Sequence, residues 1–286
     1  MLLDSKELAL GSAGRMEESS GLRQHGSALA PKVAVVTMTL ARTPAEGATL
    51  QRALHTLSQS GLPIYVGEGG SDRAFVAELS RVPHLQICPL PTRCKPSLVK
   101  QVRAAVAGAE SAAVDYVLYT EPDKVAFFRN GLLRLAASTT AETGRPADLV
   151  IAARSSRGFA SFPAGQRTAE RYMNQLCSEA LGQAGDYTYG PMLISQRLLP
   201  YMQLIPSNLD WGWRFFLMAV AHQLRFPIRL SVVGSQCPRA QRNEDDGAAR
   251  EYRLRQLVQN VTGLANGWTS LLDHQFELPP VLLPAA

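Results

Sequence analysis

Short apolar runs alternate with amphipathic stretches along most of the chain. The run at 33–38 is mostly apolar, which is typical of a central parallel strand covered on both faces. Runs of this kind predict strands at 33–38, 64–66, 85–88, 116–119, 149–153, 192–195 and 228–233. Apolar residues at helical spacing predict helices at 44–60, 72–79, 96–109, 125–138, 166–181, 198–202, 211–222 and 246–263. In the last of these, we expect four side chains to face the core: Leu254, Leu257, Val258 and Val261.

Local signals fix the ends of the first helix. Thr43 and Glu46 form a capping box, and Pro44 takes the first helical position. Gly61 ends the helix and Pro63 prevents its continuation. Because strands and helices alternate strictly in the first half of the chain, the predicted fold is an α/β fold with a mostly parallel, Rossmann-like sheet flanked by helices.

The composition of the chain predicts three parts. Residues 1–30 are rich in Ser, Gly, Glu and Ala with little periodicity, so we expect a mobile N-terminal arm. Residues 31–233 form the predicted α/β domain. Residues 234–286 are expected to form a helical C-terminal extension packed on it.

Charge and cysteine content narrow the function classes. The 286-residue chain has a net charge of +5 and a pI of about 9.2, with Arg scattered along it. A nucleic-acid surface concentrates its basic residues on one face, so we expect a small anionic ligand and no nucleic acid. The four cysteines, Cys88, Cys94, Cys177 and Cys237, have no CxxC spacing, and we expect reduced thiols.

The sequence predicts neither a targeting segment nor a membrane span. The first residues lack a basic region followed by an apolar one, and the run at 215–221 is far shorter than the roughly 18 residues that a span needs. We therefore expect a cytoplasmic protein without a transmembrane segment, working in the cytoplasm or at the membrane face. The oligomeric state is not predicted.

The most informative segment is a strand that runs into two carboxylates. Glu121 and Asp123 follow the strand at 116–119, with Pro122 between them. Side chains two positions apart on an extended backbone point to one side, and ligands of open α/β sheets lie beyond the carboxyl ends of the strands. Two hard oxygen ligands suit Mn²⁺ or Mg²⁺ carrying a diphosphate. A solvated acidic turn is the alternative.

Three other polar features lie at predicted strand ends or just before a helix. Thr37 is near the end of the first strand, and the second strand runs into the turn 67–72, with Glu68 and Asp72. A basic stretch with Lys95 and Lys100 opens the helix that precedes the acidic segment.

This order resembles the nucleotide-sugar half of the GT-A glycosyltransferases, especially their large inverting family. The turn 67–72 is similar to that family's acidic, Gly/Ser-containing turn, and Glu121-Pro122-Asp123 is similar to its DxD element. The strand at 149–154 is similar to a family strand that ends in Arg. The resemblance covers roughly 32–233 at the level of pattern.

The resemblance implies a role for each matching residue. The donor would be a nucleotide diphosphate sugar, and the acceptor a hydroxyl compound. Glu121 and Asp123 would hold the metal, and Asp210, before the acceptor-side helix, would be the general base. The nucleotide-sugar contacts would be Thr37, Glu68, Asp72, Lys95, Lys100, Glu121 and Arg154. Tyr187, Trp211 and Trp213 would lie on the acceptor side.

Several of these residues have a structural alternative. Asp72 and Asp210 are also good N-caps, Arg154 also suits a structural ion pair, and the aromatic residues also suit a core. The sequence departs from the family at Gly67, at Glu121 and in the segment 209–213. These departures keep two other functions open, a catalytically silent nucleotide-sugar-binding protein on the same fold and a nucleotidyltransferase. The latter would need a Gly-rich basic loop after the first strand, where 39–43 has none.

Overall fold

The structure is a computed structural model that describes residues 30–90, 96–139, 145–243 and 245–273. The strands are β1 (Val33–Thr39), β2 (Ile64–Glu68), β3 (Leu85–Pro89), β4 (Tyr116–Tyr119), β5 (Leu149–Arg154), β6 (Met192–Ser195) and β7 (Ile228–Val233). They form a single sheet in the order β3-β2-β1-β4-β6-β5-β7. All seven strands match the sequence predictions, and the first four are parallel neighbours as expected.

One strand runs against the others. β6 pairs antiparallel with β4 on one side and with β5 on the other, whereas β5 and β7 are parallel. The start of β6 therefore lies at the edge where the remaining strands end. The loop before β6, which contains Thr188, Tyr189 and Gly190, is placed at that edge as well.

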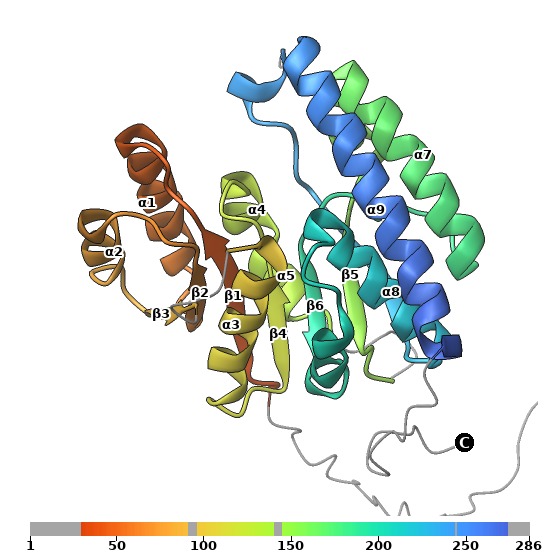
Figure 1. The fold of residues 1–286 in the computed structure, drawn as a ribbon, viewed down its shortest axis with the longest axis horizontal. Helices are drawn as coiled ribbons and strands as arrows, with labels where there is room; N and C mark the ends of the chain where they lie inside the picture. Colours follow the sequence, from red (N-terminus) through yellow and green to blue (C-terminus); the bar gives the residue numbers. More distant parts are fainter. Residues whose placement is uncertain (1–29, 91–95, 140–144, 244, 274–286) are drawn as a thin grey trace, which may run out of the picture. The chain divides into compact units, whose positions relative to one another are not determined.

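Helices cover both faces of the sheet (Figure 1). One face packs against α1 (Pro44–Ser58), α2 (Arg73–Leu79), α4 (Val125–Asn130) and α5 (Leu132–Ala136). The other packs against α3 (Leu98–Glu110), α7 (Ala164–Leu181), α8 (Trp213–Gln223) and the 3₁₀ segment η1 (Gln196–Leu204). The remaining short elements are α6 (Ser156–Ala160), η2 (Asp210–Gly212) and η3 (Arg239–Gln241).

The predicted helices occur in the structure, and the one predicted at 125–138 is divided. The first helix begins at the Thr43 cap, whose Oγ1 accepts the Glu46 amide at 3.2 Å. The helix predicted at 125–138 is two short helices separated by Gly131. A Cβ at Gly131 would lie 2.7 Å from the ring of Phe127, so the chain needs glycine at this break.

The long last helix, α9 (Gly247–Asp273), packs against α8 and α7 (Figure 1). The prediction that its apolar stripe faces the core is wrong for three of the four residues. Leu254, Val258 and Val261 are 61%, 65% and 38% exposed. Leu257 does pack against the core. Glycine allows a close approach to η2, because a Cβ on Gly263 would lie 2.0 Å from the carbonyl oxygen of Gly212.

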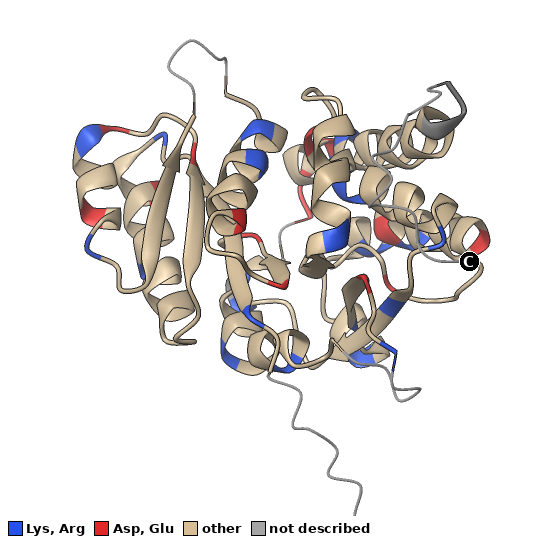
Figure 2. Cartoon of the chain, turned by 90° about the horizontal axis from the view of Figure 1, so that it is seen from below, with Lys and Arg blue, Asp and Glu red and all other residues tan. Residues whose placement is uncertain are grey.

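Charged residues are spread over the molecule. In the view of Figure 2, Lys and Arg positions occur on several helices and loops among Asp and Glu positions. In the described part of the chain, no helix has the length and apolar character needed to cross a bilayer. The predicted arm lies outside the described residues, apart from Ala30.

Candidate active site

A cleft of about 830 Å³ opens at the carboxyl ends of β1, β4 and β5. Its floor is formed by the segments that follow these strands, with Thr39, Glu121 and Arg154 among the lining residues. The N-terminal end of α3 lies on one side, and α7, η2 and α9 lie on the other. The cleft therefore stands where the topology of an open α/β sheet places a ligand.

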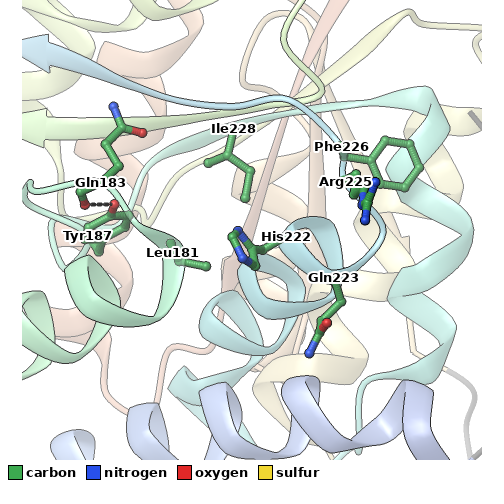
Figure 3. A pocket seen from close by; sticks show the side chains of 8 residues that line it. All are labelled: Leu181, Gln183, Tyr187, His222, Gln223, Arg225, Phe226 and Ile228. Atoms are coloured by element: carbon green, nitrogen blue, oxygen red, sulfur yellow. Dashed lines mark hydrogen bonds between the residues drawn. The ribbon is translucent and has the colours of Figure 1, made fainter. Parts of the chain in front are cut away.

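Tyr187 belongs to a different cavity. It lines a space of about 500 Å³ together with His222 and Ile228 (Figure 3). Its hydroxyl donates to the carbonyl oxygen of Gln183, and burial raises its pKa to about 12. His222 stacks on Trp268 with ring centroids 5.4 Å apart. The structure thus separates Tyr187 from the other predicted site residues that line the cleft.

Glu121 is buried at the floor of the cleft against a cation that the sequence analysis missed. Its Oε1 lies 3.2 Å from Nη1 of Arg214, a buried residue on α8. Oε2 of Glu121 and Nε of Arg214 have no hydrogen-bond partner among the described residues. A Cβ on Gly190 would lie 2.3 Å from Oε2, so glycine there leaves room for the carboxylate.

Asp123 is the more accessible carboxylate of the pair. Its side chain is 52% exposed, and its Oδ2 accepts from Nζ of Lys124 at 3.1 Å. Burial disfavours the charge on Lys124, but the carboxylates of Asp123 and Glu121 outweigh this effect and raise the pKa of its ammonium. The ammonium also lies 5.9 Å from the centre of the Tyr189 ring. Two carboxylates and two cations therefore share this end of the cleft.

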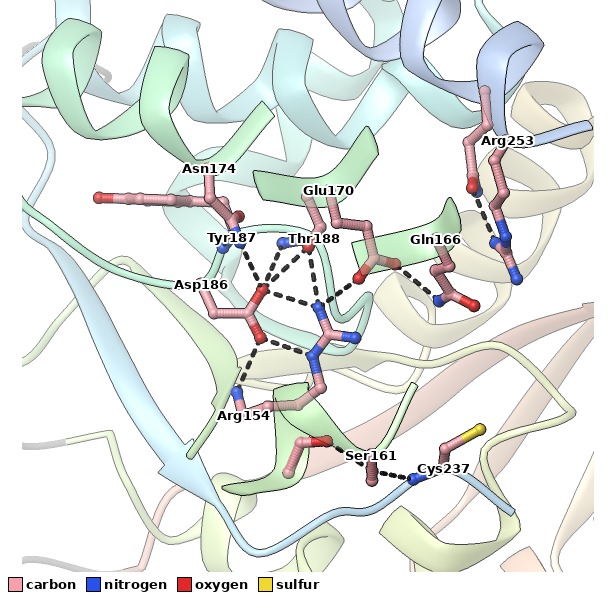
Figure 4. Close-up of polar contacts among 12 residues, drawn as sticks. Arg154, Ser161, Gln166, Glu170, Asn174, Asp186, Tyr187, Thr188, Cys237 and Arg253 are labelled. Atoms are coloured by element: carbon pink, nitrogen blue, oxygen red, sulfur yellow. Dashed lines mark hydrogen bonds and ion pairs between the residues drawn. The ribbon is translucent and has the colours of Figure 1, made fainter. Parts of the chain in front are cut away.

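Arg154 is the centre of a buried ion-pair network (Figure 4). Its Nε donates to Asp186 at 2.7 Å and its Nη2 to Glu170 at 2.8 Å, and Nη2 also reaches Thr188 at 2.9 Å. Burial alone would favour the neutral form of Arg154, yet Glu170 and Asp186 raise its pKa. The structural ion pair that the sequence left open is thus present, although Arg154 also lines the cleft.

Asp210 faces the cleft from a strained position. It begins η2 with φ of 44°, and its Oδ2 accepts from Nε2 of Gln259 on α9 at 3.1 Å. It does not cap α8, which begins at Trp213 without a side-chain cap. Asn and Asp tolerate this left-handed conformation better than other non-glycine residues. Such strain is most often found at functional sites.

The predicted acceptor-side tryptophans differ in position. Trp211 lines the cleft and lies beside Arg214, 5.9 Å from the ring centre to Cζ. Trp213 is fully buried, and its ring meets Tyr119 edge-on at 4.7 Å. Trp211 is therefore placed to meet a ligand, and Trp213 supports the floor from below.

Most of the residues predicted to contact the nucleotide from β1, β2, α3 and the turn after β2 lie outside the cleft, and two of them bind backbone amides instead. Both carboxylate oxygens of Glu68 accept backbone amides of the turn, from Gly70 and Ser71 at 2.8 Å. Asp72 caps α2 through the Phe75 amide. Thr37 is buried, Lys100 is half-buried, and none of these four residues lines the cleft. Lys95 lies outside the described residues.

Gln101 contacts the turn after β2 at a position that the sequence analysis did not single out. Its Nε2 donates to the carbonyl oxygen of Thr39 at 2.7 Å. A Cβ on Gly67 would lie 1.9 Å from the Gln101 carbonyl oxygen, and one on Gly69 would lie 2.4 Å from Nε2. The glycine at position 67, where the related pattern has an acid, therefore lets α3 approach β2.

The carboxylates at positions 121 and 123 fit a divalent metal that takes most of its other coordinating atoms from a bound substrate and water. Glu121 offers a buried oxygen without a partner, and Asp123 offers an accessible carboxylate. No cluster of three or more His, Cys, Asp or Glu suited to a metal occurs among the described residues. Mg²⁺ is commonly bound in this way, by one or two carboxylates with the remaining positions taken by substrate phosphates and water.

Comparison with known proteins adds a structural likeness. No protein-family model matches the sequence, and no curated protein matches it. The fold is similar to glucosyl-3-phosphoglycerate synthase from Mycobacterium tuberculosis in complex with Mn²⁺, UDP and glucosyl-3-phosphoglycerate, with a TM-score of 0.53 and 16% identity over 80% of each chain. The complex of that enzyme with Mn²⁺, UDP-glucose and phosphoglyceric acid gives 0.51 and 16% over 81% and 80%.

A third structure, the complex of the same enzyme with Mg²⁺ and UDP, gives a TM-score of 0.53 and 18% identity over 80% of this chain and 79% of that one. At such low identity the likeness establishes the fold. The GT-A-like α/β architecture predicted from the sequence is confirmed.

Proposed function

We propose that the protein is a glycosyltransferase that moves a sugar from a nucleotide diphosphate sugar to a hydroxyl group of an acceptor. The observation that carries this proposal is that Glu121, Asp123 and Asp210 line one cleft at the carboxyl edge of the sheet. The neighbours of the same fold bind UDP or UDP-glucose with Mn²⁺ or Mg²⁺, which supports a donor of this class.

The diphosphate of the donor would lie beside the first two carboxylates. Asp123 and the free oxygen of Glu121 would hold a divalent metal, which when bound neutralises charge on the leaving diphosphate. Lys124 and Arg214 lie next to these carboxylates and add positive charge at the same end. A preorganised set of charges of this kind stabilises a developing anion at little reorganisation cost.

Asp210 would be the general base in the transfer step. Its carboxylate takes the proton of the acceptor hydroxyl as that oxygen forms a bond to the anomeric carbon of the sugar. The bond between the anomeric carbon and the diphosphate oxygen breaks, and the nucleoside diphosphate leaves with the electron pair. Gln259 fixes the Asp210 side chain through the 3.1 Å hydrogen bond.

Turnover in the presence and absence of metal tests this function. We expect release of nucleoside diphosphate from at least one nucleotide sugar, and we expect it to depend on Mn²⁺ or Mg²⁺. Asp123→Ala should remove most of the metal-dependent donor binding while the protein stays folded, because its side chain is half-exposed on a loop. Glu251→Ala is the matched control, since it removes an exposed carboxylate from α9 that does not line the cleft.

A binding protein without catalysis is the second candidate. The Glu121–Arg214 ion pair favours it, because this contact occupies one oxygen of the first predicted metal ligand. Metal-dependent nucleotide binding without turnover of any nucleotide sugar would select this candidate. Metal-dependent binding that survives in Asp123→Ala would show that the acidic segment does not hold the metal.

A further inference from the structure

The cleft carries more positive charge than its own carboxylates balance. Its described lining includes six cationic side chains and four carboxylates. The cations are Arg42, Lys124, Arg154, Arg214, Arg253 and Arg255, and the carboxylates are Glu121, Asp123, Glu170 and Asp210. Four of the cations have a carboxylate within 4.0 Å. Of these six cations, only Arg42 and Arg253 have none among the described residues, and Arg42 is exposed on the loop after β1.

Arg253 is held in place while its charge stays unneutralised. It is half-buried on α9, and its Nη1 donates to Oε1 of Gln256 at 2.9 Å. Its Cζ lies 5.3 Å from the centre of the Tyr252 ring. A guanidinium that is oriented by its neighbours but lacks a carboxylate partner is well suited to bind the planar edge of a carboxylate or phosphate.

Arg253 lies on the same helix as Gln259, the residue that contacts the proposed general base Asp210. Gln259, which fixes Asp210, is six residues further along the same helix, a rise of about 9 Å. Figure 4 shows Arg253 reaching from α9, with Gln166 and Glu170 of α7 on the same side of the Arg154 network. All three residues line the cleft. Arg253 on α9 and Asp210 on η2 thus both line the helical side of the cleft.

We propose that Arg253 is a specificity-determining residue that binds an anionic group, a phosphate or a carboxylate, on the acceptor. The acceptor would then present its reacting hydroxyl at Asp210 and its anion about two helical turns away along α9. The assignment of this anion to an acceptor rests on the proposed glycosyltransferase function. The anion site itself rests on the position and charge of Arg253.

Binding of three small probes tests the proposal. Glycerol 3-phosphate, glycerate and glycerol carry a phosphate, a carboxylate and no charge, and each is titrated by calorimetry into the full-length protein. We expect the wild type to bind at least one of the two anions more tightly than glycerol. Arg253→Gln should weaken that binding at least tenfold. Arg250→Gln is the matched control, because Arg250 is an exposed arginine of α9 that pairs with Asp245 at 3.3 Å and does not line the cleft, and it should bind like the wild type.

The outcomes separate this site from the proposed function. Preference for glycerol 3-phosphate assigns a phosphate to the site, and preference for glycerate assigns a carboxylate. The inference is overturned if neither anion binds better than glycerol, if Arg253→Gln binds like the wild type, or if Arg250→Gln weakens binding as much as Arg253→Gln does. UDP with Mn²⁺ is titrated into the same preparations and should bind all three proteins equally. GDP, ADP and CDP are titrated in the same way, and failure of all four nucleoside diphosphates to bind would contradict the glycosyltransferase and leave an Arg253-dependent anion site standing.

Discussion

Among the carboxylates of the cleft, Asp210 has the surroundings that best suit a general base. It is half-buried in the cleft and has no cationic partner within 4.0 Å among the described residues. Its backbone is left-handed, and Gln259 donates a hydrogen bond to its carboxylate. A carboxylate in an ion pair would be a weaker base. Glu121, Asp123 and Glu170, the other carboxylates of the cleft, are each paired with a cation.

Replacing Asp210 by Asn tests the general base. Asn tolerates the same backbone conformation and keeps an oxygen for Gln259, so we expect the fold to be retained. Turnover should fall by roughly a hundredfold or more, the usual contribution of a general base, while donor affinity should change little. Asp72→Asn is the control, because it preserves a helix cap outside the cleft. Equal turnover in the two variants would remove Asp210 from the chemistry.

The Arg154 network gives a prediction for pH dependence. Burial raises the pKa of Asp186, but its hydrogen bond and charge contact with Arg154 outweigh this effect and hold the pKa below its ordinary value of 3.8. A lowered folded-state pKa means that the ionised group stabilises the fold above its unfolded pKa, and that this contribution is lost as the pH falls through the folded value.

Comparison of Asp186→Asn with the wild type isolates this contribution. At neutral pH we expect the variant to lose at least about 1.5–3 kcal/mol of unfolding free energy, the value of a hydrogen bond to a charged group. The difference should shrink as the pH falls from about 4, where the carboxyl of the unfolded chain becomes protonated, and it should be lost once the pH passes below the lower folded-state pKa. Denaturant unfolding at several pH values measures it. A difference that stays constant down to pH 2 would show that ionisation of Asp186 does not stabilise the network.

At the scale of elements, the alternation of the chain predicted every strand but not the direction of β6. The four residues of β6 read as a buried strand in either orientation, and only the pairing with β4 and β5 shows that it is reversed. This reversal brings Thr188 and Tyr189 to the site. The sequence therefore pointed to Tyr187 in the loop before β6 but could not show that Tyr189 of this loop, and not Tyr187, lines the cleft.

The pattern of apolar residues also failed to predict how α9 packs. An apolar stripe predicts a buried face, yet α9 approaches η2 through Gly263 and α8 through Gly267, and it leaves Leu254 and Val258 exposed. Small-residue contacts carry little signal in a single sequence. For the same reason Arg253 and Gln259, which this approach brings to the cleft, were not predicted.

Gly212→Ala tests the close approach of α9. A Cβ at this position would lie 2.1 Å from the carbonyl oxygen of Gln259, a backbone atom that cannot move without the helix. We expect a loss of about 1–3 kcal/mol in unfolding free energy, the usual cost of overpacking, and lower turnover because Gln259 no longer fixes Asp210. Gly234→Ala is the control, since a Cβ there meets nothing within 4 Å. Equal denaturation midpoints for the two variants would contradict this contact.

At the scale of the molecule, the proposed function divides between two parts of the cleft. The strand ends would bind the diphosphate, and the side formed by η2 and α9 would bind the acceptor. The ends of β1, β4 and β5 bring the carboxylates and the Arg154 network to one floor, and α9 adds basic and amide side chains above it. The strand-end residues were open to prediction because parallel strands end at one edge. The sequence could not show which of these side chains remain free to bind a ligand, because Glu68 and Asp72 accept hydrogen bonds from nearby backbone amides.

Binding of nucleoside diphosphates tests the central claim most directly. Thermal unfolding of the full-length protein is followed with UDP, GDP, ADP and CDP, each with and without Mn²⁺. We predict that at least one of them stabilises the protein when the metal is present, by about 2.7 kcal/mol at a hundred times its dissociation constant, and much less without the metal. The absence of stabilisation by any of the four, with or without Mn²⁺, would contradict a nucleotide-sugar site in this cleft.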